Sequence, residues 1–184
     1  MQIILASRSP RRRKLLQAAG LAVEVRPMHV DESIGENETV QETVVRLAER
    51  KAAACDIADI PVVAADTLVC LDGTAIGQPA TLDEARMMIE RLSGRTHQVY
   101  TGVCTRLGSQ QRTDMACTHV TFATLKRDEI ETYLQHNEVM DKAGAYAIQA
   151  GASAFVTAVD GPLDNVIGLP VRMTLNMLAE IHRT

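Results

Sequence analysis

The sequence predicts an α/β fold, built on a mixed, twisted sheet with flanking helices. Short apolar strands alternate along the chain with segments of helical apolar spacing. A long hairpin pattern in the second half argues against a purely parallel sheet. The length of 184 residues corresponds to about one domain. We therefore expect a single domain that covers residues 1–184.

The first third of the chain predicts strands and helices in alternation. Ser9 is placed to cap a helix that has Pro10 at its first position and ends at Gly20. Thr39 opens a second helix, in which apolar residues and Lys51 recur near the helical period. The predicted strands of this part are residues 2–6, 21–26 and 62–66.

The remaining two thirds predict the long hairpin and further helices. The Asp72-Gly73 pair is typical of a turn that joins two short strands. Thr81 and Glu84 form a capping-box pattern before a helix that ends near Gly94. Residues 165–170 predict a strand and a turn, after which Pro170 starts the last helix. The other predicted elements are strands over residues 97–106, 113–124 and 154–159 and a helix over residues 127–136.

Composition and charge exclude several classes of protein. The net charge of −4 and the scarcity of aromatic residues (3%, no Trp) disfavour a nucleic-acid binder. The apolar runs are too short to span a membrane, and the N-terminal segment lacks the pattern of an export signal. The four cysteines form no CxxC pair, so we expect no zinc site, reduced thiols and a cytoplasmic location.

A basic segment at the start of the first helix is typical of a phosphate site. Free backbone N–H groups and the positive end of the helix dipole favour anions there, and arginine can bind phosphate oxygens in a bidentate manner. Without an anion, each basic residue in the first turn would cost about 0.3–1 kcal/mol. We therefore expect Ser7, Arg11 and Arg12 to contact phosphate, whereas Arg13 and Lys14 also fit a role as surface charges.

Acidic residues supply the complementary half of such a site. Asp66 closes an apolar strand, where it could be either a site carboxylate or a turn residue. Asp31 and Glu32 follow an earlier strand and could add a second carboxylate, although a solvated loop explains them better on this pattern alone. Lys51 could contact phosphate, although an exposed lysine is the commoner outcome. Carboxylates of this kind hold Mg²⁺, which in turn bridges phosphate oxygens.

Two residues further along have both functional and structural explanations. Gln149 carries an amide that could recognise a base edge, because it both donates and accepts hydrogen bonds. Tyr146, in the same small-residue segment, fits a role in the core. His97 is better explained as a strand histidine than as a metal ligand, because no second ligand has the required spacing.

Taken together, these segments resemble the Maf family of nucleotide pyrophosphatases over nearly the whole chain. The resemblance implies an inosine triphosphatase-like fold with two lobes and a central cleft. It also implies hydrolysis of a nucleoside triphosphate to the monophosphate and pyrophosphate with Mg²⁺ or Mn²⁺, in a homodimer. The segments that carry it are residues 5–12, 31–32, 51–52, 64–67, 94–103, 141–149 and 166–170.

The resemblance also implies a role for individual residues. Asp66 corresponds to the proton acceptor and, with Glu32, to the metal site. Ser7, Arg12 and Lys51 correspond to further positions around the phosphates and metal. The positions that set base preference correspond to Arg11, Thr67 and Gln149. The Asp66-Thr67 pair and the segment around Gln149 resemble the branch that acts on dTTP and UTP.

Two departures from the family pattern keep alternatives open. Gln78 replaces a lysine that is common in the family, and Ala150 replaces a usual glycine. If position 150 required positive φ, alanine there would cost about 1 kcal/mol. The alternatives are a regulatory nucleotide-binding protein of septum formation with vestigial hydrolysis, and a pyrophosphatase that removes modified nucleotides or prefers another base, such as 7-methyl-GTP.

Overall fold

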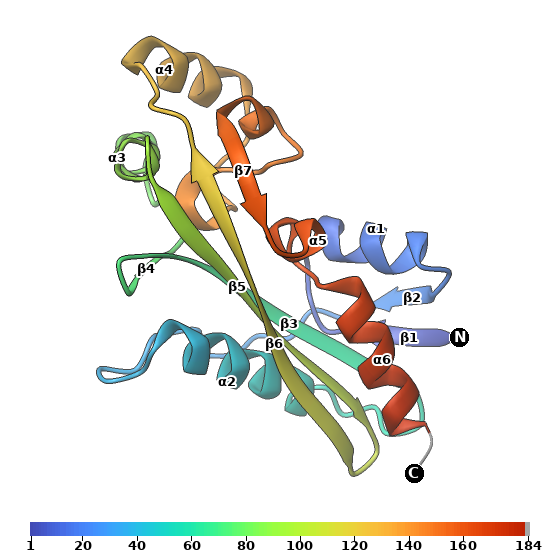
Figure 1. Ribbon diagram of the computed structural model, residues 1–184. Coiled ribbons are helices and arrows are strands. Elements are labelled where there is room, and N and C mark those ends of the chain that lie inside the picture. Colours follow the sequence, from blue (N-terminus) through green and yellow to red (C-terminus); the bar gives the residue numbers. More distant parts are fainter. Residues whose placement is uncertain (183–184) are drawn as a thin grey trace. The chain divides into compact units, whose positions relative to one another are not determined.

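A computed structural model describes residues 1–182 as a seven-stranded sheet with helices around it (Figure 1). The strands are β1 (Gln2–Leu5), β2 (Ala22–Val25), β3 (Val62–Leu71), β4 (Thr74–Ile76), β5 (Thr96–Leu107), β6 (Gln110–Phe122) and β7 (Val156–Asp160). The helices are α1 (Pro10–Ala18), α2 (Val40–Ala53), α3 (Leu82–Leu92), α4 (Arg127–His136), α5 (Leu163–Ile167) and α6 (Val171–Ile181), with 3₁₀ turns η1 (Ala143–Ala145) and η2 (Ala152–Phe155).

The sheet is mixed, as predicted. Its strand order is β2-β1-β3-β5-β6-β7, and β4 pairs with β3. β1 runs parallel to β2 and β3, whereas β4 is antiparallel to β3 and β7 is antiparallel to β6. None of the helices within residues 1–182 is long and apolar enough to cross a membrane.

The chain forms two compact units. The first comprises Met1–Thr67, Thr101–Ala116 and Gly168–Thr184, and the second comprises Leu68–Tyr100 and Cys117–Ile167. The segments of the two units interleave along the sequence, so neither unit is a continuous stretch of chain. The single domain expected over residues 1–184 stays a prediction.

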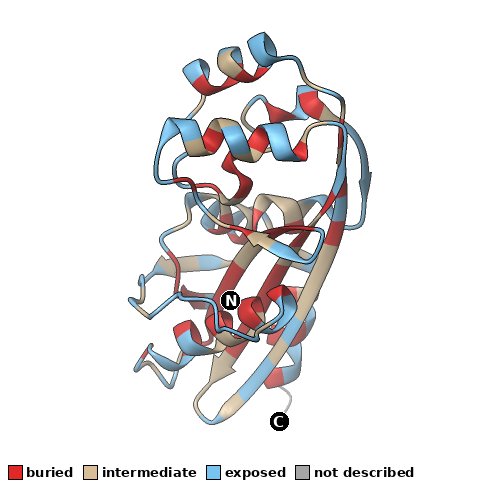
Figure 2. Ribbon diagram, turned by 90° about the vertical axis from the view of Figure 1, so that its left-hand side faces the viewer, coloured by how far each residue is buried: buried red, intermediate tan, exposed pale blue. Residues whose placement is uncertain are grey.

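The first unit has helices on both faces of its strands. Because side chains alternate along a strand, odd and even residues of β1 and β3 point to opposite faces. One face packs against α1 and α6, through Ile3, Leu5, Val63, Ala65, Leu16 and Leu178. The other packs against α2, through Ile4, Val62, Ala64, Ala48 and Ala52. Figure 2 shows the buried residues along these strands.

Local sequence signals explain where the first two helices begin. The Ser9 hydroxyl accepts a hydrogen bond from the Arg12 backbone N–H, and Pro10 is the first helical residue of α1. Thr39 and Glu42 form a complete capping box at the start of α2. Both helix starts were predicted, and both set the direction from which Arg12 and Lys51 leave the helices.

Two predicted elements differ from the structure. β3 does not end at Asp66 but continues to Leu71, because its pairing does not end with β1. β1 pairs with Val62 and Val63, whereas Val69–Leu71 pair with β4, and β5 is the neighbour of β3 on the other side. Residues 165–170 do not begin with a strand. Asn165 lies in the short helix α5, where its buried amide donates to the Val99 carbonyl, and Gly168 then adopts positive φ.

The second unit has an aromatic core that contains His97. The imidazole lies edge-on to Phe122 and Tyr146, and its Nε2 is 2.8 Å from the Tyr146 hydroxyl. Burial lowers the pKa of His97 from 6.5 to about 4. His97 is thus a strand histidine, as the sequence indicates, and Tyr146 is a core residue.

This histidine predicts an acid-dependent loss of stability. Between pH 6.5 and 4 the unfolded chain takes up a proton that the folded chain does not, so the free energy of unfolding falls by about 3 kcal/mol as the pH decreases. Denaturant unfolding of His97→Gln should lack this loss, whereas the exposed His119→Gln should retain it. Equal pH dependence of wild type and His97→Gln would contradict the assignment.

Candidate functional site

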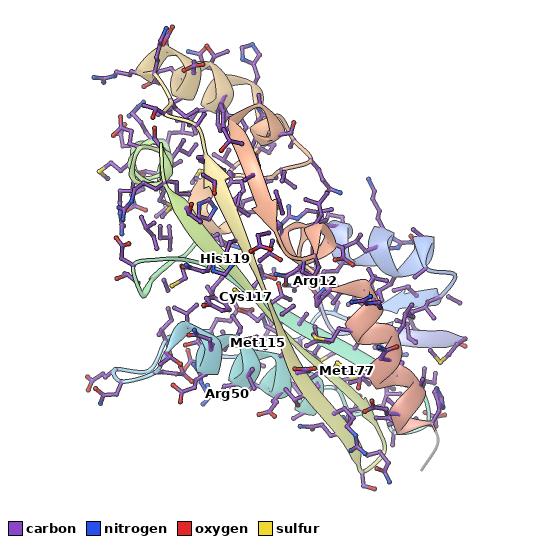
Figure 3. The ribbon with its side chains drawn as sticks, viewed as in Figure 1. Arg12, Arg50, Met115, Cys117, His119 and Met177 are labelled. Carbon is purple, nitrogen blue, oxygen red and sulfur yellow. The ribbon has the colours of Figure 1, made fainter. Side chains whose placement is uncertain are left out.

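Arg12, which is labelled in Figure 3, lies on the first turn of α1. It is the centre of a buried hydrogen-bond network in the first unit. Its Nε donates to the Gly168 carbonyl at 2.8 Å. One terminal nitrogen donates to Ser7 Oγ at 3.0 Å and to the Ala65 carbonyl at 2.8 Å, and the other donates to Thr67 Oγ1 at 3.0 Å. The guanidinium therefore binds the chain on both sides of Asp66.

These contacts use most of the hydrogen-bond donors of Arg12. A guanidinium has five N–H groups, and the protein occupies four of those of Arg12. The bidentate phosphate contact expected from sequence would have to break existing bonds. Burial lowers the pKa of Arg12, and the attraction of the Asp66 carboxylate opposes this effect. Arg12 thus holds the backbone on both sides of Asp66, and its contact with phosphate stays a prediction.

Lys51 connects the two candidate metal carboxylates. Its Nζ lies 2.5 Å from Asp66 Oδ1 and 2.7 Å from Glu32 Oε1. Lys51 and Asp66 are each only 7% exposed, whereas the Glu32 side chain is 61% exposed. An exposed Lys51 was the commoner expectation from the sequence, and this is wrong. Lys51 lies near the end of a helix that packs on the sheet, and it is buried because it faces the Asp66 carboxylate.

Strand alternation explains why the two cations approach from different sides. Asp66 continues the series of even residues that face α2, which carries Lys51. Thr67 continues the odd series that faces α1, which carries Arg12. Asp66 lies past the last pair between β1 and β3, so the site lies beyond the carboxyl end of β1.

A glycine of β5 lets α2 approach the sheet closely. A Cβ built at Gly102 would lie 2.3 Å from the Val44 carbonyl oxygen, a distance that no side chain tolerates. The helix backbone therefore packs directly on the strand at this position. Lys51, two turns further along α2, depends on this approach to reach Asp66.

The loop that carries Glu32 is tied to α2 by arginine side chains. Arg46 forms a paired ion bridge with Glu38, at 2.5 and 2.6 Å, and donates to the Ser33 carbonyl at 2.9 Å. The Arg46 guanidinium lowers the pKa of Glu38 to about 2. Arg50 adds a hydrogen bond to the Asp31 carbonyl at 3.4 Å. These contacts fix the loop on both sides of Glu32.

Asp31 and Arg11 each lie next to a residue of this cluster in the chain. The Asp31 carboxylate accepts a hydrogen bond from the Ser33 backbone N–H, which lowers the pKa of Asp31. Asp31 thus serves the turn and, unlike Glu32, makes no ion pair with Lys51. Arg11 is half-buried and close enough to Arg12 to lower its pKa.

Three residues of the second unit, Gln78, Gln149 and Ala150, were also singled out from the sequence. Gln149 is exposed, and its part in base preference stays a prediction. Gln78 donates from its amide to the Asp141 carbonyl at 3.2 Å. Positive φ falls on Ala145 and Gly151 and not on Ala150, so the backbone cost considered for Ala150 does not arise.

Two contributors to the site were not found from the sequence. Thr101 of β5 is fully buried, and its hydroxyl lies 2.9 Å from Thr67 Oγ1, where it completes the Arg12 network. Gly168 contributes a backbone carbonyl, which no side-chain pattern can indicate. Thr101 is one of several polar residues of β5, so its residue type gave no signal that set it apart.

Comparison with known families and structures identifies relatives over the whole chain. The model of the family described as Maf-like protein matches residues 2–181. Two solved structures have the same fold: the Ham1 protein of Staphylococcus aureus (TM-score 0.54, 12% identity, 100% of both chains) and a HAM1 protein of Coxiella burnetii (TM-score 0.53, 16% identity, 100% of this chain and 98% of that one). These structures confirm the predicted fold class.

Curated relatives are considerably closer in sequence. The dTTP/UTP pyrophosphatase of Bacillus pumilus is 42% identical and covers 96% of this chain and 95% of its own length. The protein of the same name from Symbiobacterium thermophilum is 44% identical, with 97% and 93% covered. That of Anaeromyxobacter sp. (strain Fw109-5) is 45% identical, with 96% and 88% covered.

Proposed function

Because this chain belongs to the Maf family, we propose that it is a nucleoside triphosphate pyrophosphatase that acts on dTTP and UTP. The reaction would release the nucleoside monophosphate and pyrophosphate by cleavage of the α–β phosphoanhydride bond. The observation that carries the proposal is the convergence of Arg12, Lys51, Glu32 and Asp66 in one unit. The names of the relatives above support the choice of substrate.

Asp66 is the candidate proton acceptor. Its carboxylate is largely buried and faces the side of the sheet that α2 covers. Of the acids that pair with Lys51 in the part of the chain that the structure describes, Asp66 is the buried one. A carboxylate held in this way can orient a water molecule and accept its proton as the oxygen attacks the α-phosphorus. Arg12 keeps the backbone on either side of Asp66 in place while this happens.

Lys51 and the helix start supply positive charge for the phosphates. The Lys51 ammonium lies between the Glu32 and Asp66 carboxylates and would supply positive charge to a phosphate bound beside them. The backbone N–H groups of the first turn of α1 and the half-buried Arg11 add further donors. Such groups stabilise the charge that develops on the leaving pyrophosphate.

The donor set fits a divalent cation such as Mg²⁺ or Mn²⁺. Glu32 and Asp66 both point at one position, because each contacts the same Lys51 nitrogen. A cation held by these two carboxylates would neutralise phosphate charge and bridge phosphate oxygens. On the family resemblance, we assign base preference to Arg11, Thr67 and Gln149. We also propose a homodimer and a cytoplasmic location for the protein.

The test is a panel of nucleoside triphosphates with detection of both products. With Mg²⁺, dTTP and UTP should each give monophosphate and pyrophosphate in equal amounts, faster than other pyrimidine or purine triphosphates, including 7-methyl-GTP. A preference for another base would move the proposal to another branch of the family. Binding of nucleotide without any product would instead favour a regulatory protein.

A further inference from the structure

We propose that Lys51 occupies the cation position between Glu32 and Asp66 until the nucleotide arrives, so that this site takes up a divalent cation only together with a triphosphate. The proposal rests on the function proposed above and specifies the form of its substrate, the metal–nucleotide complex. It assigns Lys51 a second role as a positioning residue: before the metal ion binds, the ammonium group takes its place and keeps the two carboxylates together.

The position of the ammonium group is the first argument. Lys51 Nζ lies 2.5 Å from one carboxylate and 2.7 Å from the other, which are distances of direct charge-assisted hydrogen bonds. A cation that used the same two oxygens would need the space that Nζ fills. Lys51 therefore has to leave before a metal ion can bind between these two oxygens.

The number of available ligands is the second argument. No group of three or more His, Cys, Asp or Glu residues among residues 1–182 is arranged to hold a metal ion. Mg²⁺ requires six oxygen ligands and commonly combines one or two carboxylates with substrate phosphates and water. Two carboxylates that share one lysine, which neutralises half of their charge, do not compete well with water for the free ion.

The charge balance supplies the third argument. Lys51 neutralises one of the two carboxylate charges, so the empty pair carries one net negative charge, and the Asp66 carboxylate also attracts Arg12. A triphosphate brings several negative charges. The Lys51 ammonium can move to pair with these charges while the carboxylates bind the metal ion. If Lys51 left without a metal ion arriving, or a metal ion arrived without Lys51 leaving, a buried charge would lack a partner. The exchange of the two together avoids this.

The experiment measures Mn²⁺ binding without catalysis. The electron paramagnetic resonance signal of free Mn²⁺ disappears on binding, and it is followed for the wild type, Lys51→Met and the matched control Lys14→Met, which removes an exposed lysine. Without nucleotide, Lys51→Met should bind Mn²⁺ at least about tenfold more tightly than the wild type. Lys14→Met should match the wild type.

Two further measurements keep the outcome decisive. Lys51→Gln replaces Lys51→Met if the latter does not fold, and thermal melting should show stabilisation by Mn²⁺ in the variant only. With the non-hydrolysable α,β-methylene-UTP, the wild type should bind one Mn²⁺ ion for each nucleotide bound. Tight binding of free Mn²⁺ by the wild type, or equal affinity in the wild type and both Lys51 variants, would overturn the proposal.

Failure of the proposed function would look different from failure of this inference. It would appear as the absence of monophosphate and pyrophosphate from every nucleotide tested, whatever the Mn²⁺ titrations show. The comparison of the wild type with Lys51→Met in the absence of nucleotide does not depend on which base or bond the site prefers.

Discussion

Asp66→Asn should lower kcat for dTTP and UTP by about 10²–10⁴-fold, the usual contribution of a general base. Asparagine has nearly the same shape as aspartate but cannot accept the proton of the attacking water. It also removes the negative charge that pairs with Lys51. The rate of pyrophosphate release at saturating nucleotide and Mg²⁺ measures the effect.

The matched control for this variant is Asp59→Asn, which makes the same change at an exposed aspartate of the first unit. It should retain wild-type turnover. Because Asp66 is buried, circular dichroism of Asp66→Asn should first establish that the variant is folded. A folded Asp66→Asn protein with near-normal kcat would remove Asp66 from the role of proton acceptor.

Arg12→Ala should destabilise the protein and inactivate it together. The change leaves two carbonyls and two hydroxyls without their donor in a buried region, which predicts a loss of about 3–5 kcal/mol in the free energy of unfolding. Turnover should fall because the backbone around Asp66 is no longer held. Urea unfolding and steady-state kinetics provide the two measurements.

Arg12→Lys and Arg13→Ala separate a positioning role from a phosphate contact. Lysine keeps the charge but cannot reach all four acceptors, so Arg12→Lys should lose kcat and stability with a smaller change in KM. The exposed Arg13→Ala should resemble the wild type in both respects. If Arg12→Lys and Arg12→Ala raised KM alone and left stability unchanged, Arg12 would instead be a phosphate ligand.

Local signals in the sequence were sufficient for most of the fold. The caps at Ser9 and Thr39, the Asp72-Gly73 turn and the helical spacing of α2 act over a few residues and need no tertiary information. The end of β3 was not predictable in this way. Its extent depends on the strands that pair with it, and β1 pairs with only its first residues.

The residues of the candidate site could be singled out from the sequence, whereas their contacts could not. The residue types of Ser7, Arg12, Lys51 and Asp66 indicated a phosphate and metal site. That Arg12 turns inward follows from acceptors at Ala65 and Gly168, which are backbone carbonyls and leave no trace in the sequence. The burial of Lys51 likewise follows from how closely α2 packs at Gly102.

Hydrolysis in ¹⁸O-labelled water tests the central claim most directly. Wild-type protein, Mg²⁺ and dTTP or UTP are incubated in the labelled solvent, and the monophosphate and pyrophosphate are analysed by mass spectrometry. If a water oriented by Asp66 attacks the α-phosphorus, one labelled oxygen will be found in the monophosphate and none in the pyrophosphate. Label in the pyrophosphate, or release of inorganic phosphate with a diphosphate product, would contradict the account.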